Sequence, residues 1–253
     1  MTTIRVAGLW FADRSPGSFQ LTPLGRTPGE VEVRDSDVLT FRSTKDASQR
    51  SLVSLASEPV AYQVYHLELV RQQLLRGGPE LWGPLARACP LETMTLHLVS
   101  PLDFAGIEAL TSLRDLSIGR QTLLAEAGRH LGALSSLDRL VLQQLTLEYE
   151  FVQALVKSRS QLRKLSLLSC QLSGDAVEAL AYLPSLKELA LFCRGVEPDS
   201  VRAVIAAAPH LQLLGIRRDI QEATSLEREI SASCPGLKIS WFGESPSREK
   251  ADS

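Results

Sequence analysis

A leucine pattern recurs along most of the chain and constrains its fold more than any other feature. The pattern L-x-x-L-x-L occurs in five clear copies, which begin at Leu113, Leu137, Leu162, Leu186 and Leu211. Two less regular copies lie upstream and a degraded copy follows, beginning at Val64, Leu91 and Leu237. Successive copies begin about 22 to 27 residues apart, a period that indicates a solenoid of stacked repeats.

Each repeat contains the signals of one strand and one helix. The alternating leucines of a copy point to one side of a short strand, and the residues between them point to the other. A second apolar cluster with a spacing of three or four residues follows and predicts a helix, as in Val177-Leu180-Leu183. Ser173 and Pro198 precede two such helices and are typical of helix starts. We therefore predict an α/β solenoid, with a parallel sheet on the concave face and helices on the convex face.

The segment Leu162–Leu180, with the sequence LRKLSLLSCQLSGDAVEAL, carries a family resemblance. It resembles the cysteine-containing, F-box-associated type of leucine-rich repeat, and the Cys89-Pro90 and Cys234-Pro235 junctions are similar to a junction of that class. The resemblance covers about Val64 to Phe242 and implies a leucine-rich-repeat solenoid that binds other proteins. We find no recognisable F-box segment in the chain.

One position departs from the family pattern in most repeats. The residue after each strand that the class usually fills with Asn or Cys is Cys170 in one repeat only. The equivalent residues elsewhere are Gln72, Val99, Gln121, Leu145, Arg194 and Asp219. We therefore expect turns without the usual side-chain ladder to backbone amides, and an irregular solenoid.

Residues 1–62 do not fit the repeat and are predicted to form a β-rich N-terminal cap or small module. Strands are predicted near residues 4–11, 19–21, 31–33 and 38–41, with turns at Ser15-Pro16-Gly17 and Thr27-Pro28-Gly29 and a short helix at 51–57. A cap is favoured because the first repeat would otherwise expose its core. The solenoid, with seven or eight repeats, is assigned to residues 63–243, and the polar residues 244–253 are predicted to be disordered.

Composition excludes several classes of function. The net charge of −2 weighs against a nucleic-acid partner. No apolar stretch approaches the roughly 20 residues that cross a bilayer, and the first residues lack the pattern of a secretory signal. Four scattered cysteines without a CxxC pair disfavour a metal site or a disulfide framework. We therefore expect a cytoplasmic protein without a membrane partner.

No catalytic motif or cofactor-binding signature is present, so we expect neither an enzyme nor a bound cofactor. His66, His97 and Glu68 lie on outward strand positions and offer too few ligands for a metal site, so two surface histidines are the favoured interpretation. Cys193 is interpreted as facing outward and as more reactive than the other cysteines, which are assigned to the core.

The outward positions of the concave strands are the candidate binding surface. Their middle positions are mostly small, and basic residues flank an apolar step at Leu168 and Phe192. Arg and aromatic residues are typical of protein-binding hot spots. The candidate partner-binding residues are His97, Arg139, Lys164, Leu168, Phe192, Arg217 and Arg218.

The function predicted from these features is a non-catalytic protein–protein interaction module. One alternative is a toxin-neutralising or effector-regulating subunit that inhibits a partner enzyme, and another is a substrate-recognition adaptor. A third interpretation treats the candidate residues as ordinary solvated strand faces. The identity of the partner protein stays open, as does membership of a larger complex.

Overall fold

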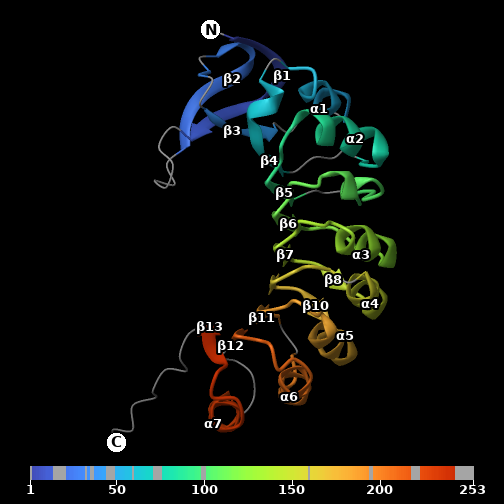
Figure 1. Cartoon of the computed structure of the whole chain (residues 1–253), viewed down its shortest axis with the longest axis vertical. Helices are drawn as coiled ribbons and strands as arrows, with labels where there is room; N and C mark the ends of the chain where they lie inside the picture. The colour runs from blue at the N-terminus through green and yellow to red at the C-terminus, as the bar shows by residue number, and fades with distance from the viewer. Residues whose placement is uncertain are drawn as a thin grey trace, which may run out of the picture.

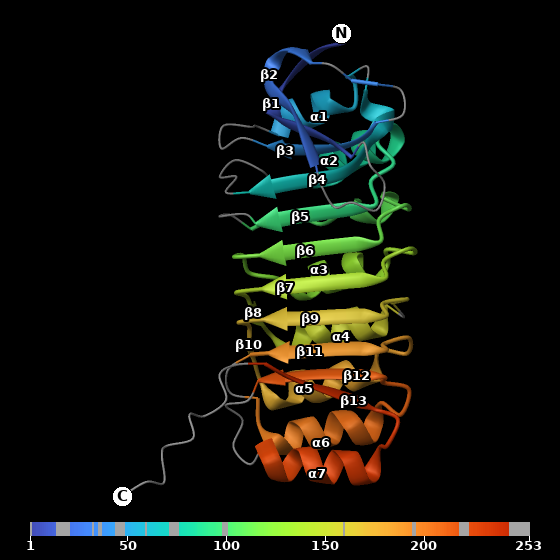
Figure 2. The same cartoon turned by 90° about the vertical axis from the view of Figure 1, so that its left-hand side faces the viewer.

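The structure is a computed structural model of the 253-residue chain. It describes residues 2–13, 21–31, 33–34, 37–43, 49–58, 60–70, 76–97, 101–158, 160–193, 196–217 and 223–242. The described elements form an open arc, with the strands lining its concave side and the helices its convex side (Figure 1). Figure 2 shows the strands stacked as one ladder in front of the helical layer. The predicted solenoid and its two layers are confirmed.

One eleven-stranded sheet runs the length of the arc, in the order β13-β12-β11-β9-β7-β6-β5-β4-β3-β1-β2. Neighbouring strands from β3 to β13 pair in parallel. These strands are β3 (Val38–Ser43), β4 (Val64–Val70), β5 (Thr93–His97), β6 (Asp115–Gly119), β7 (Arg139–Gln143), β9 (Lys164–Leu168), β11 (Glu188–Phe192), β12 (Leu213–Arg217) and β13 (Lys238–Phe242). The two-residue strands β8 (Thr146–Leu147) and β10 (Gln171–Leu172) pair separately.

The N-terminal strands extend this sheet. β1 (Thr2–Asp13) pairs antiparallel with both β2 (Leu21–Val31) and β3. The expected turn at Thr27-Pro28-Gly29 is wrong, because these residues lie inside β2, where Thr27 and Gly29 pair with Gly8 and Ile4 of β1. β2 is the edge strand of the sheet. A proline on an edge strand can direct its nitrogen, which has no hydrogen to donate, away from the neighbouring strand, so no inter-strand hydrogen bond is lost. The other expected turn, at residues 15–17, lies outside the described residues.

A helical element follows most of the strands on the convex side. The α-helices are α1 (Gln49–Leu55), α2 (Pro79–Ala88), α3 (Ala125–Gly132), α4 (Tyr149–Lys157), α5 (Gly174–Ala179), α6 (Pro198–Ala207) and α7 (Ala223–Ser233). Short 3-10 helices are η1 (Ala61–Gln63), η2 (Ile107–Ala109) and η3 (Leu180–Tyr182). The predicted helix starts are confirmed, since the Ser173 hydroxyl accepts a hydrogen bond from the backbone N–H of Ala176 and Pro198 opens α6.

The core is continuous from the cap through the repeats. In the eleven-stranded sheet, the inward side chains of β4, β5, β6, β7, β9, β11 and β12 are at most 2% exposed, as the leucine pattern requires. At the N-terminal end, Trp10 and Phe41 are fully buried and their rings are 5.0 Å apart. Each fully buried Leu or Phe contributes about 1.5–3 kcal/mol, so stacking supplies the stability that no single repeat possesses.

Backbone hydrogen bonds continue the ladder beyond the strand ends. Arg120, Gln144 and Ser169 follow β6, β7 and β9, and each has a positive φ. Each donates its N–H to the last carbonyl of the next strand, at Gln143, Leu168 and Phe192 respectively, over 2.8–3.1 Å. Gln121 occupies the position that the repeat class usually fills with Asn or Cys. Its side-chain oxygen accepts a hydrogen bond from the Leu102 N–H at 3.2 Å. Backbone geometry therefore keeps these turns regular where the side chains vary.

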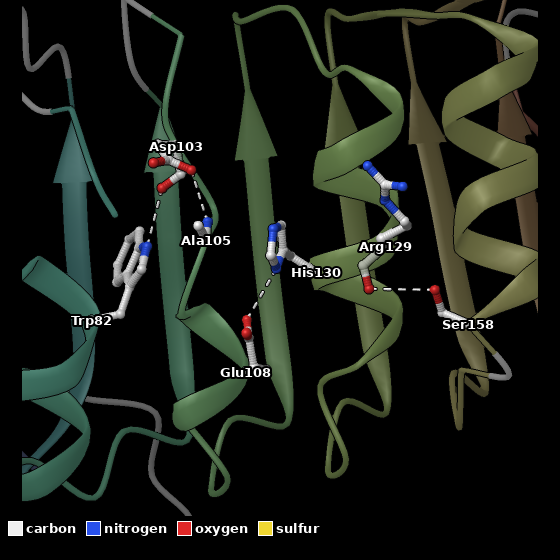
Figure 3. Close-up of polar contacts among 7 residues, drawn as sticks. All are labelled: Trp82, Asp103, Ala105, Glu108, Arg129, His130 and Ser158. Carbon is white, nitrogen blue, oxygen red and sulfur yellow. Dashed lines mark hydrogen bonds and ion pairs between the residues drawn. The ribbon is translucent and has the colours of Figure 1, made fainter. Parts of the chain in front are cut away.

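Polar contacts tie the convex elements of neighbouring repeats to one another (Figure 3). The Trp82 indole N–H donates to the Asp103 carbonyl at 3.1 Å, and His130 Nδ1 lies 3.2 Å from Glu108 Oε2. The Ser158 hydroxyl donates to the Arg129 carbonyl at 3.3 Å. Because these groups join consecutive repeats, they serve the stacking of the solenoid.

Candidate functional site

The concave face carries a hollow between β6 and β13. It encloses about 550 Å³ and is floored by small side chains, which include Ser166, Ala190, Gly215 and Ser240. These residues are the middle outward positions of consecutive strands, as the registers show. Because the middle positions are small, the sheet leaves room for protruding side chains of a partner.

An aromatic shelf, formed by Phe192 and Phe242, closes one end of the hollow. The two rings meet edge to face, with centroids 4.4 Å apart and planes 64° apart. They belong to β11 and β13 and meet across β12, where Gly215 provides the space. A Cβ on Gly215 would lie 3.3 Å from Cζ of Phe192. Phe242 is nevertheless 47% exposed, so the shelf presents apolar surface to solvent.

Charged side chains line the opposite end of the hollow. Lys164 Nζ lies 3.0 Å from Glu188 Oε1, and both side chains are partly exposed. Arg139 is exposed, and the structure places no ion pair on it among the residues that it describes. Glu188 therefore neutralises Lys164, and the roles of Lys164 and Arg139 in partner binding stay predictions.

Of the other predicted partner-binding residues, Leu168 and Arg217 lie beside the hollow. Leu168 is the neighbour of Phe192 in the sheet register, and Arg217 is the neighbour of Phe242. Both are half-buried and flank the shelf, although neither lines the hollow. Arg218 lies outside the described residues.

His97 lies on β5, away from the hollow. Its ring lies against Gly119, where a Cβ would come within 2.9 Å of Cδ2. Burial, reinforced by the positive charge of Arg120, lowers the pKa of His97 below its ordinary value. Its Nε2 is shielded from solvent and has no hydrogen-bond partner. The ring is therefore mostly neutral at pH 7 and does not join the cationic groups of the site.

Phe242 and Glu188 were missed as site residues. The last repeat is degraded, and its leucine pattern is recognisable only from its inward residues Leu237, Ile239 and Trp241. The strand alternation nevertheless predicts that Lys238, Ser240 and Phe242 face outward. Glu188 occupies the same register position as Lys164 in the next repeat, so the ion pair could have been inferred from the leucine alignment.

The prediction that Cys193 faces outward is wrong. Because Phe192 faces outward on β11, the next residue turns inward, and Cys193 is 2% exposed. Its thiol lies 3.5 Å from the Leu167 carbonyl. A hydrogen bond with Cys170, together with burial, raises the pKa of Cys193. Burial also raises the pKa of Cys89 to about 12. These thiols stay protonated at neutral pH and belong to the core.

The histidine pair does not form a metal site within the described part of the chain. Glu68 Oε2 lies 2.6 Å from Arg42 Nε in an ion pair. No cluster of three metal-ligating side chains occurs among the described residues. None of the described helices is both long and apolar enough to cross a membrane.

A comparison with models of known protein families agrees with the repeat assignment. Residues 129–249 match the family model of the leucine-rich repeats of FBD-associated F-box protein At5g56370. A crystal structure of an internalin from Listeria monocytogenes is similar, with a TM-score of 0.45 and 14% identity over 81% of this chain and 59% of the internalin chain. This chain thus spans less than two thirds of that protein. A search of curated proteins gives no match.

Proposed function

We propose that this chain, a leucine-rich-repeat protein, is a non-catalytic recognition module that binds a partner protein on its concave face between β7 and β13. The observation that carries the proposal is the aromatic shelf beside the hollow. Phe242 keeps 47% of its surface exposed although it packs on Phe192. Leucine-rich-repeat domains are generally protein-interaction modules, which agrees with this use of the surface.

The shelf and the rim have different roles in the proposed binding. Covering the two rings removes apolar surface from water, which yields about 25 cal/mol for each Å². Arg139 and the ion pair of Lys164 with Glu188 favour partners whose charges are complementary to theirs, and they fix the orientation of the bound partner. The strands are already ordered by parallel pairing, so binding has a small conformational cost.

The proposal is tested by removing the shelf and keeping the fold. Native purification of the wild-type chain and of a Phe192→Ala/Phe242→Ala variant is followed by quantitative mass spectrometry. A Tyr182→Ala variant is the matched control, because Tyr182 is 67% exposed but lies in the helical layer, in η3. Proteins that bind the shelf are retained by the control and lost by the double variant.

The expected effect on affinity is large. A hot-spot aromatic contributes 2 kcal/mol or more, which corresponds to about a 30-fold change in the dissociation constant. Unfolding curves of the two variants verify that both remain folded. If every protein that binds the wild-type chain binds the folded double variant equally well, the concave shelf is not the binding site.

A second candidate is a substrate-recognition adaptor. It is favoured by the match of residues 129–249 to repeats of an F-box protein, because this range contains β7 to β13 and therefore the shelf. An adaptor joins two proteins through separate surfaces. Under this candidate, the shelf variant loses one co-purifying protein and keeps a second one. Loss of all co-purifying proteins together favours the simpler module.

A further inference from the structure

β13 is the last strand of the sheet among the described residues, and its core side is incompletely covered. The inward side chains of the preceding strands of the same sheet, from β4 through β12, are at most 2% exposed, whereas Ile239 and Trp241 are only half-buried. Nε1 of Trp241 is shielded from solvent and has no hydrogen-bond partner. The core therefore ends on side chains that a further layer would cover.

Among the residues that the structure describes, no strand pairs with the far side of the β13 backbone, so this edge is open. The Lys238 N–H donates to the Gln212 carbonyl, next to β12, at 2.9 Å. Because successive residues of a strand direct their N–H and C=O groups to alternate sides, Ile239 and Trp241 direct theirs away from β12. The opposite edge strand, β2, contains Pro23 and Pro28, and prolines block added strands. β13 contains no proline.

We propose that the edge of β13 pairs antiparallel with β13 of a second copy of this chain. The sequence of β13, KISWF, is its own complement in this arrangement. A two-fold axis through Ser240 places Ile239 opposite Trp241 of the other copy, and Lys238 opposite Phe242. Pairs of a β-branched residue with an aromatic residue stabilise antiparallel strands, and Lys over Phe adds a cation–π contact.

The hydrogen-bond geometry agrees with this axis. Ile239 and Trp241 form two hydrogen-bonded pairs with their counterparts, which gives four main-chain hydrogen bonds. The two Ser240 residues form the non-hydrogen-bonded pair between them, with Cα atoms about 4.5 Å apart. The axis is perpendicular to the sheet, so both concave faces open to the same side and the two aromatic shelves become neighbours.

A second copy fits this edge better than other occupants. Residues 243–253, which follow β13, contain no large apolar side chain, so their chemistry does not suit Ile239 and Trp241. The side chains of Glu227 and Arg228 on α7 are exposed, so α7 adds little apolar surface. The interface is therefore small, and the dissociation constant is expected to be on the order of 100 μM.

The test uses disulfide trapping across the proposed axis. Ser240→Cys is introduced together with Cys234→Ser, which removes a half-buried native thiol. Lys238→Cys in the same background is the matched control. Both changes are on the concave side of β13, but two copies of residue 238 would be about 14 Å apart, too far for a disulfide.

The expected result is that Ser240→Cys forms a covalent dimer under oxidised glutathione at least about tenfold faster than Lys238→Cys. Sedimentation velocity of the unmodified chain is expected to show a dimer that grows with concentration near the dissociation constant. Equal trapping rates for the two variants overturn the proposal. A chain that stays monomeric at these concentrations, or a β13 edge that pairs only with a strand of a different protein, also overturns it.

Discussion

Replacement of Gly128 by alanine provides a sharp test of how closely the convex helices pack. Gly128 lies in α3, where alanine normally stabilises a helix by about 1 kcal/mol relative to glycine. A Cβ at this position would lie 2.4 Å from the carbonyl oxygen of Phe151 and 3.1 Å from Cβ of Ala154, both in α4. Because the nearest atom belongs to the backbone, α3 and α4 must move apart.

The magnitude follows from these two opposing effects. Overpacking against a rigid neighbour costs about 3 kcal/mol, at the upper end of the usual range, and the gain in helix propensity offsets about 1 kcal/mol. Gly128→Ala should therefore lower the free energy of unfolding by about 2 kcal/mol. Urea denaturation followed by circular dichroism measures this change.

Gly236→Ala is the matched control for this prediction. No atom lies within 4 Å of a Cβ at Gly236, and its φ is not positive. Its stability should be unchanged or raised by about 0.4–1 kcal/mol, through the lower entropy of the unfolded chain. A Gly128→Ala variant as stable as the wild type would show that α3 and α4 are not in the close contact described.

Two further predictions concern titratable groups. The pKa of His97 is lower in the folded chain than its ordinary value, so the unfolded chain binds the proton more readily. His97 therefore destabilises the fold as pH falls below about 6.5, and His97→Gln should reduce the difference between urea midpoints at pH 7.5 and pH 5.5. An unchanged difference would contradict the burial of this ring. For the thiols, iodoacetamide at pH 8 should modify Cys234 in the folded chain and leave Cys89, Cys170 and Cys193 unmodified until urea is added. Early modification of Cys193, measured by mass spectrometry, would contradict its inward orientation.

The sequence was most informative where burial imposes a period. The leucine triplets fix which side of each strand faces the core, and hence that Arg139, Lys164 and Phe192 face outward. Contacts between repeats were harder to predict, since Phe192 on β11 meets Phe242 on β13 only because Gly215 leaves space on the strand between them. That contact depends on side-chain conformations, which the leucine pattern does not determine.

Two errors have different physical origins. Cys193 was assigned to the wrong side because it follows β11 directly and continues its alternation, which was not counted past Phe192. Thr27-Pro28-Gly29 was assigned to a turn on local propensity alone. Pairing with β1 overrides that propensity in the edge strand β2, where proline is tolerated.

Each short strand of the repeats has one set of buried side chains and one set of side chains on the concave surface. Two side chains, such as Leu189 and Leu191, are buried, whereas Glu188, Ala190 and Phe192 project from the concave face of the same strand. Substitutions at projecting positions usually change stability by no more than about 0.5 kcal/mol. The residues of the concave face can therefore diverge during evolution while the leucine framework stays constant, and gain of a repeat lengthens that face by one more strand.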